Sequence, residues 1–133
     1  MNRRVRAIIE VGDDVLLIHR VKAGKEYWVF PGGGVEECDA SEKDALIREA
    51  REELGVLVSI GDLFAALTSS DSEELFYRCS IASGSLGTGT GPELMRDPTI
   101  SGSYEVQWVS KSDMEGRSVY PLEIRDMLLG KTQ

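Results

Sequence analysis

The sequence predicts an α/β fold in which a mixed β-sheet is covered by helices on both faces. Three observations lead to this class. Short apolar segments of strand character lie on both sides of one well-marked helix, a second helix is indicated near the carboxyl end, and strands and helices alternate without a strict βαβ rhythm. At 133 residues the chain fits one ordinary domain, and we expect residues 1–133 to form it.

The first part of the chain is expected to form strands separated by turns. Val5–Val11 and Val15–Val21 are apolar segments on either side of a Gly-Asp-Asp turn, which is the pattern of a hairpin. Tyr27–Phe30 is a short aromatic strand that ends at Pro31. We expect Gly32–Gly34 to form a flexible loop, because glycine adopts backbone angles that other residues resist.

The segment Ser41–Leu54 is the clearest helix. Ser41 is a good N-cap, and Asp44 three residues later resembles a capping-box residue, with Asp in place of the usual Glu or Gln. Gly55 supplies a typical C-terminal stop.

The second half of the chain is expected to contain more strands, a loop and a closing helix. The strand candidates are Val56–Ile60, Leu63–Thr68, Leu75–Ala82 and Tyr104–Val109. Gly84–Pro98 is rich in glycine, which favours a mobile loop, and it lacks the Lys-Ser/Thr of a P-loop. Pro121–Leu129 predicts the last helix, with proline in its first turn and Gly130 after its end.

Composition and charge exclude several classes of function. The formal net charge is -8, whereas nucleic acids and anionic membranes attract Lys/Arg-rich surfaces, so we expect neither partner. An anionic ligand would need a local positive source, such as a bound metal or a few arginines. Cys38 and Cys79 do not suggest a disulfide framework, and the apolar run of the basic N-terminus is too short for a signal peptide. The expected location is the cytoplasm.

Three glutamates crowd the end of the predicted helix. Glu49, Glu52 and Glu53 share one face of it, beside the apolar stripe, when each residue advances by about 100°. Like charges at these spacings destabilise a helix by a few tenths of a kcal/mol each, and the helix dipole disfavours them at this end. The face is either simply solvated, with Arg48 and Arg51 neutralising part of it, or it binds something positive.

The glycines upstream favour a cation. A glycine-rich backbone can approach a ligand closely, and carboxylate and carbonyl oxygens suit Mg²⁺ or Mn²⁺. A bound divalent cation would cancel the repulsion between the glutamates. We expect Glu53 to occupy a solvent-facing position of this helix.

The stretch PGGGVEECDASEKDALIREAREELGV resembles the signature box of the MutT-like Nudix hydrolases. The second half of the box matches at Arg48, Glu49, Ala50, Glu52, Glu53, Gly55 and Val56. The order of elements around the box, two strands before it and a strand and closing helix after it, is also similar to that family. The resemblance implies a Nudix-type α/β/α sandwich with the mixed sheet between helices.

The first half of the box departs from the family pattern. With Gly33 as its opening glycine, Asp39 stands where the family has Glu, and the box Gly33–Val56 contains one extra residue. With Gly34 as the opening glycine the spacing is restored, but Ala40 takes the acidic position. The first alignment is preferred because it also matches the flanking residues Pro31, Gly32, Val35 and Glu36.

The resemblance implies a metal-dependent hydrolase that cleaves the diphosphate bond of a nucleoside diphosphate linked to a group X. By this analogy the metal ligands are Glu49, Glu52, Glu53 and the backbone carbonyl of Gly32, with Mg²⁺ or Mn²⁺ as cofactor. Arg48 would hold a glutamate in position. Two general bases stay open, Glu52 itself and Glu105, and Glu105 is equally well explained as an exposed strand residue. Glu93 and Asp97 are further candidates.

The substrate is expected to be a small nucleoside diphosphate derivative. Arg20 is a candidate phosphate contact or a plain surface arginine. Tyr27 and Trp28 could stack on a base, and core packing explains Trp28 at least as well. His19 is expected to be structural or exposed, and the two cysteines have no metal-ligand spacing.

Three interpretations are compared. A catalytically inactive nucleotide-binding or sensor domain would usually have lost a glutamate of the box, and here all three are present. An acidic protein-interaction domain does not explain why a glycine-rich segment precedes a helix lined by carboxylates. The hydrolase is therefore preferred. The identity of X and the oligomeric state stay open, and homodimers are common in the family.

Overall fold

The computed structural model describes residues 2–89 and 102–131. Their elements, in chain order, are β1 (Asn2–Val11), β2 (Asp14–Lys22), β3 (Lys25–Val29), β4 (Gly32–Gly34), α1 (Glu42–Leu54), β5 (Val56–Thr68), β6 (Ser72–Gly84), β7 (Ser103–Ser110), α4 (Lys111–Met114), β8 (Val119–Tyr120) and α5 (Leu122–Leu128). No helix in these two ranges is both long and apolar enough to cross a membrane.

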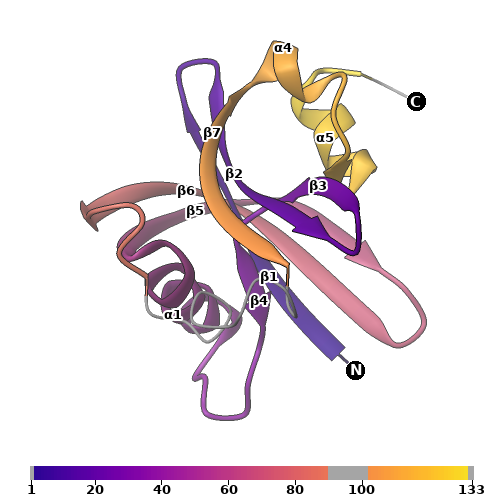
Figure 1. Cartoon of the computed structure of the whole chain (residues 1–133). Coiled ribbons are helices and arrows are strands. Elements are labelled where there is room, and N and C mark those ends of the chain that lie inside the picture. The colour runs from indigo at the N-terminus through magenta and orange to yellow at the C-terminus, as the bar shows by residue number, and fades with distance from the viewer. Residues whose placement is uncertain (1, 90–101, 132–133) are drawn as a thin grey trace.

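The sheet is mixed and splits into two halves that meet at the β1–β2 hairpin (Figure 1). β1 pairs with β2 only near the turn, at Glu10–Val15 and Val11–Asp14. Away from the turn, β1 pairs instead with β4 and, in parallel, with β6, and β5 follows β6. β2 pairs with β3 and β7. The short strand β4 therefore lies where β1 and β2 have separated.

Two apolar cores lie on opposite sides of this sheet. One core contains Leu46, Ala50 and Leu54 of α1, packed on Val5 and Ile18 of the strands. The other lies under the carboxyl-terminal elements and joins Met114, Ile124 and Leu128 to strand residues such as Leu17 and Phe76. Helices thus cover both faces, which confirms the predicted α/β class with a mixed sheet between helices.

Helix α1 forms as its sequence predicts. The Ser41 side chain accepts a hydrogen bond from the Asp44 amide at 3.1 Å, which satisfies one of the free N–H groups of the first turn. Gly55 adopts a left-handed φ of 80°, and its N–H donates to the carbonyls of Ala50 and Arg51. These caps and the apolar stripe set the length of the helix and the face that it buries.

The prediction of a flexible loop at the three glycines is wrong, because Gly32–Gly34 pairs with β1 as the strand β4. Glycine is required here for close approach rather than for flexibility. A Cβ on Gly32, whose φ is +148°, would lie 2.0 Å from the Val5 carbonyl oxygen. The glycine-rich segment is therefore a rigid part of the fold that fixes its own position against α1.

Other differences concern the ends of elements. The two strands predicted between Val56 and Thr68 form one strand, β5, with register shifts that mark β-bulges. The short elements α4 and β8 carry too little pattern to be predicted. Of the predicted loop Gly84–Pro98, residues 90–98 lie outside the described residues, and so do the candidates Glu93 and Asp97.

Candidate functional site

Two of the three glutamates of α1, Glu49 and Glu53, lie against the strand of glycines. The carboxylate of Glu49 lies so close to Gly33 that a Cβ added there would stand 2.5 Å from its Cδ. The side chain of Glu52 is 38% exposed, whereas that of Glu49 is 14% exposed, and Arg48 contacts both. The glycine backbone therefore leaves room for a carboxylate that any larger residue would displace.

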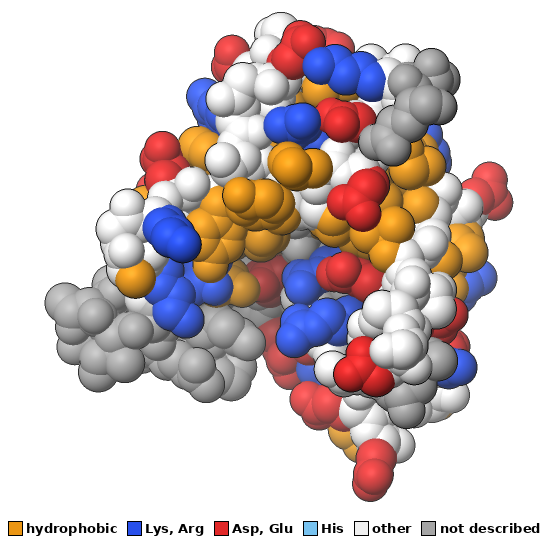
Figure 2. Space-filling view, turned by 90° about the vertical axis from the view of Figure 1, so that its right-hand side faces the viewer, with side chains coloured by type: hydrophobic (Ala, Val, Ile, Leu, Met, Phe, Trp, Pro, Cys, Tyr) orange, Lys and Arg blue, Asp and Glu red, His pale blue; other side chains and the backbone are white. Residues whose placement is uncertain are grey.

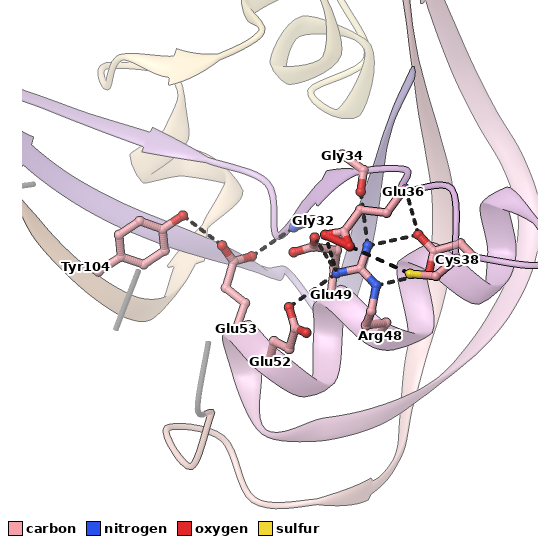
Figure 3. A network of polar contacts seen from close by, with 10 residues as sticks. Gly32, Gly34, Glu36, Cys38, Arg48, Glu49, Glu52, Glu53 and Tyr104 are labelled. Carbon is pink, nitrogen blue, oxygen red and sulfur yellow. Dashed lines mark hydrogen bonds and ion pairs between the residues drawn. The ribbon is translucent and has the colours of Figure 1, made fainter. Parts of the chain in front are cut away.

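Glu53 is buried, and here the expectation of a solvent-facing ligand is wrong. Among the described residues it is the one buried charged residue, with 5% of its surface exposed. The Gly32 N–H donates to its Oε1 at 2.8 Å, and the Tyr104 hydroxyl donates to its Oε2 at 2.8 Å (Figure 3). Burial raises the pKa of Glu53 to about 7, although these two hydrogen bonds act to lower it.

Arg48 connects the glutamates to the start of the signature box (Figure 3). Its Nη1 lies 3.0 Å from Glu49 Oε1 and 3.3 Å from Glu52 Oε2. Its other nitrogens donate to Asp39 at 2.9 and 3.0 Å and to the Gly34 carbonyl at 3.1 Å. Hydrogen bonds from the Arg48 guanidinium lower the pKa of Asp39. Asp39 thus anchors the arginine across the insertion in the box.

Tyr104 is a site residue that the sequence analysis missed. Its ring lies under the guanidinium of Arg20, whose Cζ is 4.3 Å from the ring centroid, while its hydroxyl binds Glu53. Arg20 also donates from Nε to the Ser103 carbonyl at 3.1 Å. The alternation of the predicted strand Tyr104–Val109 could have indicated this, because successive side chains of a strand face opposite sides. If Tyr104 faces α1, its neighbour Glu105 faces away.

Glu105 lines one pocket together with Glu53, but its side chain is held by contacts on the other face of β7. It lies opposite His19 in the β2–β7 ladder, and its carboxylate accepts a hydrogen bond from Gln107 Nε2 on the same face. Gln107 in turn accepts from the indole N–H of Trp28 at 3.0 Å. The arrangement gives Glu105 a role in holding this face of the sheet, and the predicted role as a base stays without support from its position.

Arginines line a pocket beside Glu49. Arg4, Arg6, Arg20, Tyr27, the three glycines and Glu49 contribute to its wall, and its volume is about 460 Å³. Figure 2 shows a hollow on this side of the molecule in which Lys/Arg and Asp/Glu side chains lie next to each other below a hydrophobic patch. The structure therefore brings the two predicted substrate contacts, Arg20 and Tyr27, to the same pocket as the glutamate helix.

The two further arginines of this pocket come from β1. Arg6 is partly buried and donates to Glu74 at 2.8 Å and to the Phe30 carbonyl at 3.2 Å, whereas Arg4 is exposed. Alternation along the strand places both on one side. They were missed because the predicted strand began at Val5, which left Arg4 outside it. In a chain of net charge -8, this cluster is a local positive source.

The remaining candidates are structural. Trp28 is only 7% exposed. Its ring is contacted by His19 at 4.7 Å between centroids and by Arg117 at 4.8 Å. It is therefore a core residue, and His19, which is 2.7 Å from Glu26, belongs to the same cluster.

The donor set at α1 fits a hard divalent cation by its chemistry. The carboxylates of Glu49 and Glu53 lie against a glycine strand, that of Glu52 shares Arg48 with Glu49, and oxygen is the ligand that Mg²⁺ and Mn²⁺ prefer. Yet within residues 2–89 and 102–131 no three acidic, histidine or cysteine side chains are already gathered around one point. The reason is visible in the contacts: Arg48 stands between Glu49 and Glu52, and Glu53 is turned toward Tyr104.

Comparison with protein families gives one match that covers most of the chain. The model of the NUDIX domain matches residues 1–120. A CTP pyrophosphohydrolase of Escherichia coli (strain K12) is 42% identical over 64 residues, which are 47% of this chain and 47% of that protein. An uncharacterized Nudix hydrolase, YvcI, of Bacillus subtilis (strain 168) is 36% identical over 58 residues, which are 44% of this chain and 35% of that protein. Each match spans less than half of the relative's length.

Solved structures share the fold over nearly the whole chain. The solution structure of the Escherichia coli ORF135 protein has a TM-score of 0.66 and 27% identity, covering 98% of this chain and 86% of that one. An ADP-ribose pyrophosphatase of Streptococcus suis has a TM-score of 0.70 at 21% identity, covering 97% and 90%. A UDP-X diphosphatase has a TM-score of 0.70 at 16% identity, covering 97% and 61%. The last two identities show a common fold alone.

Proposed function

The chain belongs to the NUDIX domain family, and on that premise we propose that it is a metal-dependent hydrolase that cleaves the diphosphate bond of a nucleoside diphosphate linked to X. The activity consists of the attack of an activated water at a phosphorus atom. The names of the relatives fit this class, because they include a pyrophosphohydrolase and a diphosphatase.

One observation carries the proposal: the glutamate helix and an arginine-lined pocket meet at the same glycine strand. Glu49 of the helix and Gly33 of the strand are in contact, and both line the pocket. A diphosphate needs positive charge along its oxygens, and the pocket offers Arg4 and Arg20 for it. Its reacting phosphorus must also lie near groups that hold a metal and a water, and Glu49 is on the pocket wall. A merely solvated acidic face would have no reason to adjoin such a pocket.

The proposed metal ligands are Glu49, Glu52, Glu53 and the Gly32 carbonyl. In an antiparallel ladder the N–H and C=O of one residue point to the same side. The Gly32 N–H points at Glu53, so the Gly32 carbonyl is directed to the same side. A bound Mg²⁺ or Mn²⁺ would lower the pKa of a bound water and neutralise charge on the phosphates. Ionised Glu53 and a cation would stabilise one another, because the carboxylate is costly to bury unpaired.

Arg48 is proposed as a positioning residue. Two of its nitrogens are held by Asp39 and by the Gly34 carbonyl, so the guanidinium has a fixed base. The third, Nη1, is left for Glu49 and Glu52. This arrangement aligns the two carboxylates with charge-assisted hydrogen bonds.

Glu52 is the preferred general base. Its carboxylate is the most exposed of the three, with 38% of the side chain accessible, so a water can reach it. Glu105 is less suited, because its carboxylate lies on the other side of β7 from Tyr104 and accepts from Gln107. Proton transfer to a positioned carboxylate contributes typically about 10²- to 10⁴-fold to a rate.

A second candidate function has one observation in its favour. The carboxylates are not gathered around a point, and Arg48 bridges two of them. A nucleotide-binding domain without catalysis would have the same arrangement. The two functions differ in whether a divalent cation enables turnover.

The deciding experiment measures phosphate or nucleoside monophosphate release from nucleoside triphosphates, nucleotide sugars, ADP-ribose and dinucleoside polyphosphates. We expect hydrolysis of at least one substrate with Mg²⁺ or Mn²⁺ and none with chelator. Hydrolysis that ignores chelator contradicts the metal-dependent mechanism. Tight nucleotide binding with no turnover of any substrate selects the sensor function.

A further inference from the structure

Trp108 is an exposed tryptophan on the face of β7 that looks toward α1. Strand alternation places it on the same side as Tyr104 and Val106, both of which pack against the core beneath α1. Its exposed fraction is 41%, whereas Trp28 is 7% exposed. Among the described residues it has no ring contact or hydrogen bond, so both its ring and its indole N–H are available. A tryptophan with so much exposed apolar surface is a candidate contact for a ligand.

The ring stands at the wall of a pocket of about 500 Å³. The pocket is lined by Glu53, Leu86, Gly87, Tyr104, Glu105, Val106 and Trp108. Leu86, Val106 and Trp108 supply apolar surface, and Glu53, Glu105 and Tyr104 supply polar groups. The volume lies within the range of small-molecule sites, and an apolar pocket with a few polar groups is their usual composition. The volume and the mixed lining suit a group of the size of a nucleobase, which has apolar faces and polar edges.

The position of this pocket connects it to the glutamates. Tyr104 lines both this pocket and the arginine-lined pocket, and its hydroxyl donates to Glu53, which lines this pocket as well (Figure 3 shows the Tyr104–Glu53 contact). A ligand with its flat group against Trp108 would thus have its next atoms beside α1. The phosphates of a nucleotide would continue toward Arg20 and Glu49.

The other aromatic residues near the site are less suited to stacking. Both neighbours of Trp28, His19 and Arg117, already lie against its ring. Tyr27 lines the arginine-lined pocket, and its ring is paired with that of Tyr120 at 6.1 Å between centroids. Charge there suits phosphate better than a base.

We propose that Trp108 binds the nucleobase of the substrate by stacking, in the pocket between β7, the end of α1 and Leu86–Gly87. This inference rests on the proposed function, since it supposes a nucleotide substrate. It assigns the base and the phosphates to two different pockets that share Tyr104.

The test measures binding of nucleoside monophosphates, which contain no diphosphate bond to cleave, to the full chain in the presence of Mg²⁺. CMP, UMP, AMP and GMP are compared with ribose 5-phosphate, which lacks a base. Base–aromatic stacking is worth about 1–3 kcal/mol by alanine substitution, so Trp108→Ala is expected to weaken binding of the monophosphates about 5- to 150-fold. Ribose 5-phosphate should bind both proteins equally, and Trp108→Phe should retain most of the affinity.

Tyr120→Ala is the matched control, because it removes an aromatic side chain of similar exposure, 46%, from the competing site beside Tyr27. Unchanged affinity of Trp108→Ala for all four monophosphates, or a loss confined to Tyr120→Ala, would overturn the proposal. The proposed base site and the proposed hydrolase activity can fail independently of each other. If the wild type hydrolyses a nucleotide but Trp108→Ala binds and turns over normally, only the base site fails. If no substrate is hydrolysed while Trp108→Ala loses monophosphate binding, the proposed hydrolase fails and the base site stands.

Discussion

Replacing Glu53 with glutamine is expected to stabilise the metal-free protein above neutral pH. The Glu53 carboxyl is 5% exposed, and burial raises its pKa to about 7. Glutamine keeps the shape and the acceptor for the Gly32 N–H, and its amide can donate to the Tyr104 oxygen. It therefore resembles the protonated carboxyl, which is the form that the buried environment favours.

The magnitude follows from the pKa difference between the folded and the unfolded chain. The pKa of Glu53 rises from an ordinary value of 4.5 to about 7 on folding. Each pKa unit is worth about 1.4 kcal/mol, so the free energy of unfolding falls by up to about 3 kcal/mol between low pH and high pH. The sign is set by the direction: the folded protein binds the proton more tightly, so wild-type stability is fully present below pH 4.5 and is lost as the pH rises toward about 7. Glutamine does not titrate, so the stability of Glu53→Gln should not fall in this way as the pH rises.

The assay is urea denaturation of both proteins at pH 5 and pH 8, in excess chelator. We expect Glu53→Gln to be more stable than wild type at pH 8 by up to about 3 kcal/mol, with a much smaller difference at pH 5. Glu52→Gln is the matched control, since its side chain is 38% exposed and surface substitutions usually change stability by less than about 0.5 kcal/mol. A Glu53→Gln protein less stable than wild type at pH 8 would refute the argument from burial.

Two substitutions test how the glycine strand and the arginine-lined pocket serve the site. Gly33→Ala should displace the Glu49 carboxylate, because the new Cβ would stand 2.5 Å from Glu49 Cδ. A misplacement of about 1 Å at a reacting centre costs about 100-fold in rate, so kcat should fall by up to that factor. Gly116→Ala, where a Cβ meets nothing within 4 Å, should leave kcat unchanged. Arg4→Gln should raise KM for the substrate about 5-fold or more, while Arg3→Gln, on the opposite side of β1, should leave it unchanged. Steady-state kinetics measures both, and equal effects within either pair would contradict the assignment.

The parts of the fold that the sequence predicted are those with strong local signals. Helix α1 carries an N-cap, a glycine stop and an apolar stripe, so its ends follow from residues within the segment. The single strand β5 was predicted as two, because its bulges interrupt the alternation on which the prediction relied. The glycine segment was misjudged because its conformation depends on pairing with β1, more than twenty residues earlier in the chain.

The candidate site was predicted in its residue types and only partly in its environment. The helical wheel placed the glutamates on one face, but it could not show that Glu53 would lie under Tyr104, because that contact joins residues separated by 51 positions. The same holds for the arginine-lined pocket, which combines side chains from strands of both half-sheets. Asp39, a departure from the family pattern, was of unknown consequence in the sequence, and the structure shows it bound to Arg48 through two nitrogens.

The measurement that bears most directly on the central claim is a crystal structure of the protein soaked in Mn²⁺, with the ion located by its anomalous scattering. We predict Mn²⁺ bound by carboxylate oxygens of the Glu49, Glu52 and Glu53 group. Diffraction without an anomalous peak at these side chains, at Mn²⁺ concentrations that saturate any activity, would contradict the claim that the glutamate face of α1 exists to bind divalent cations.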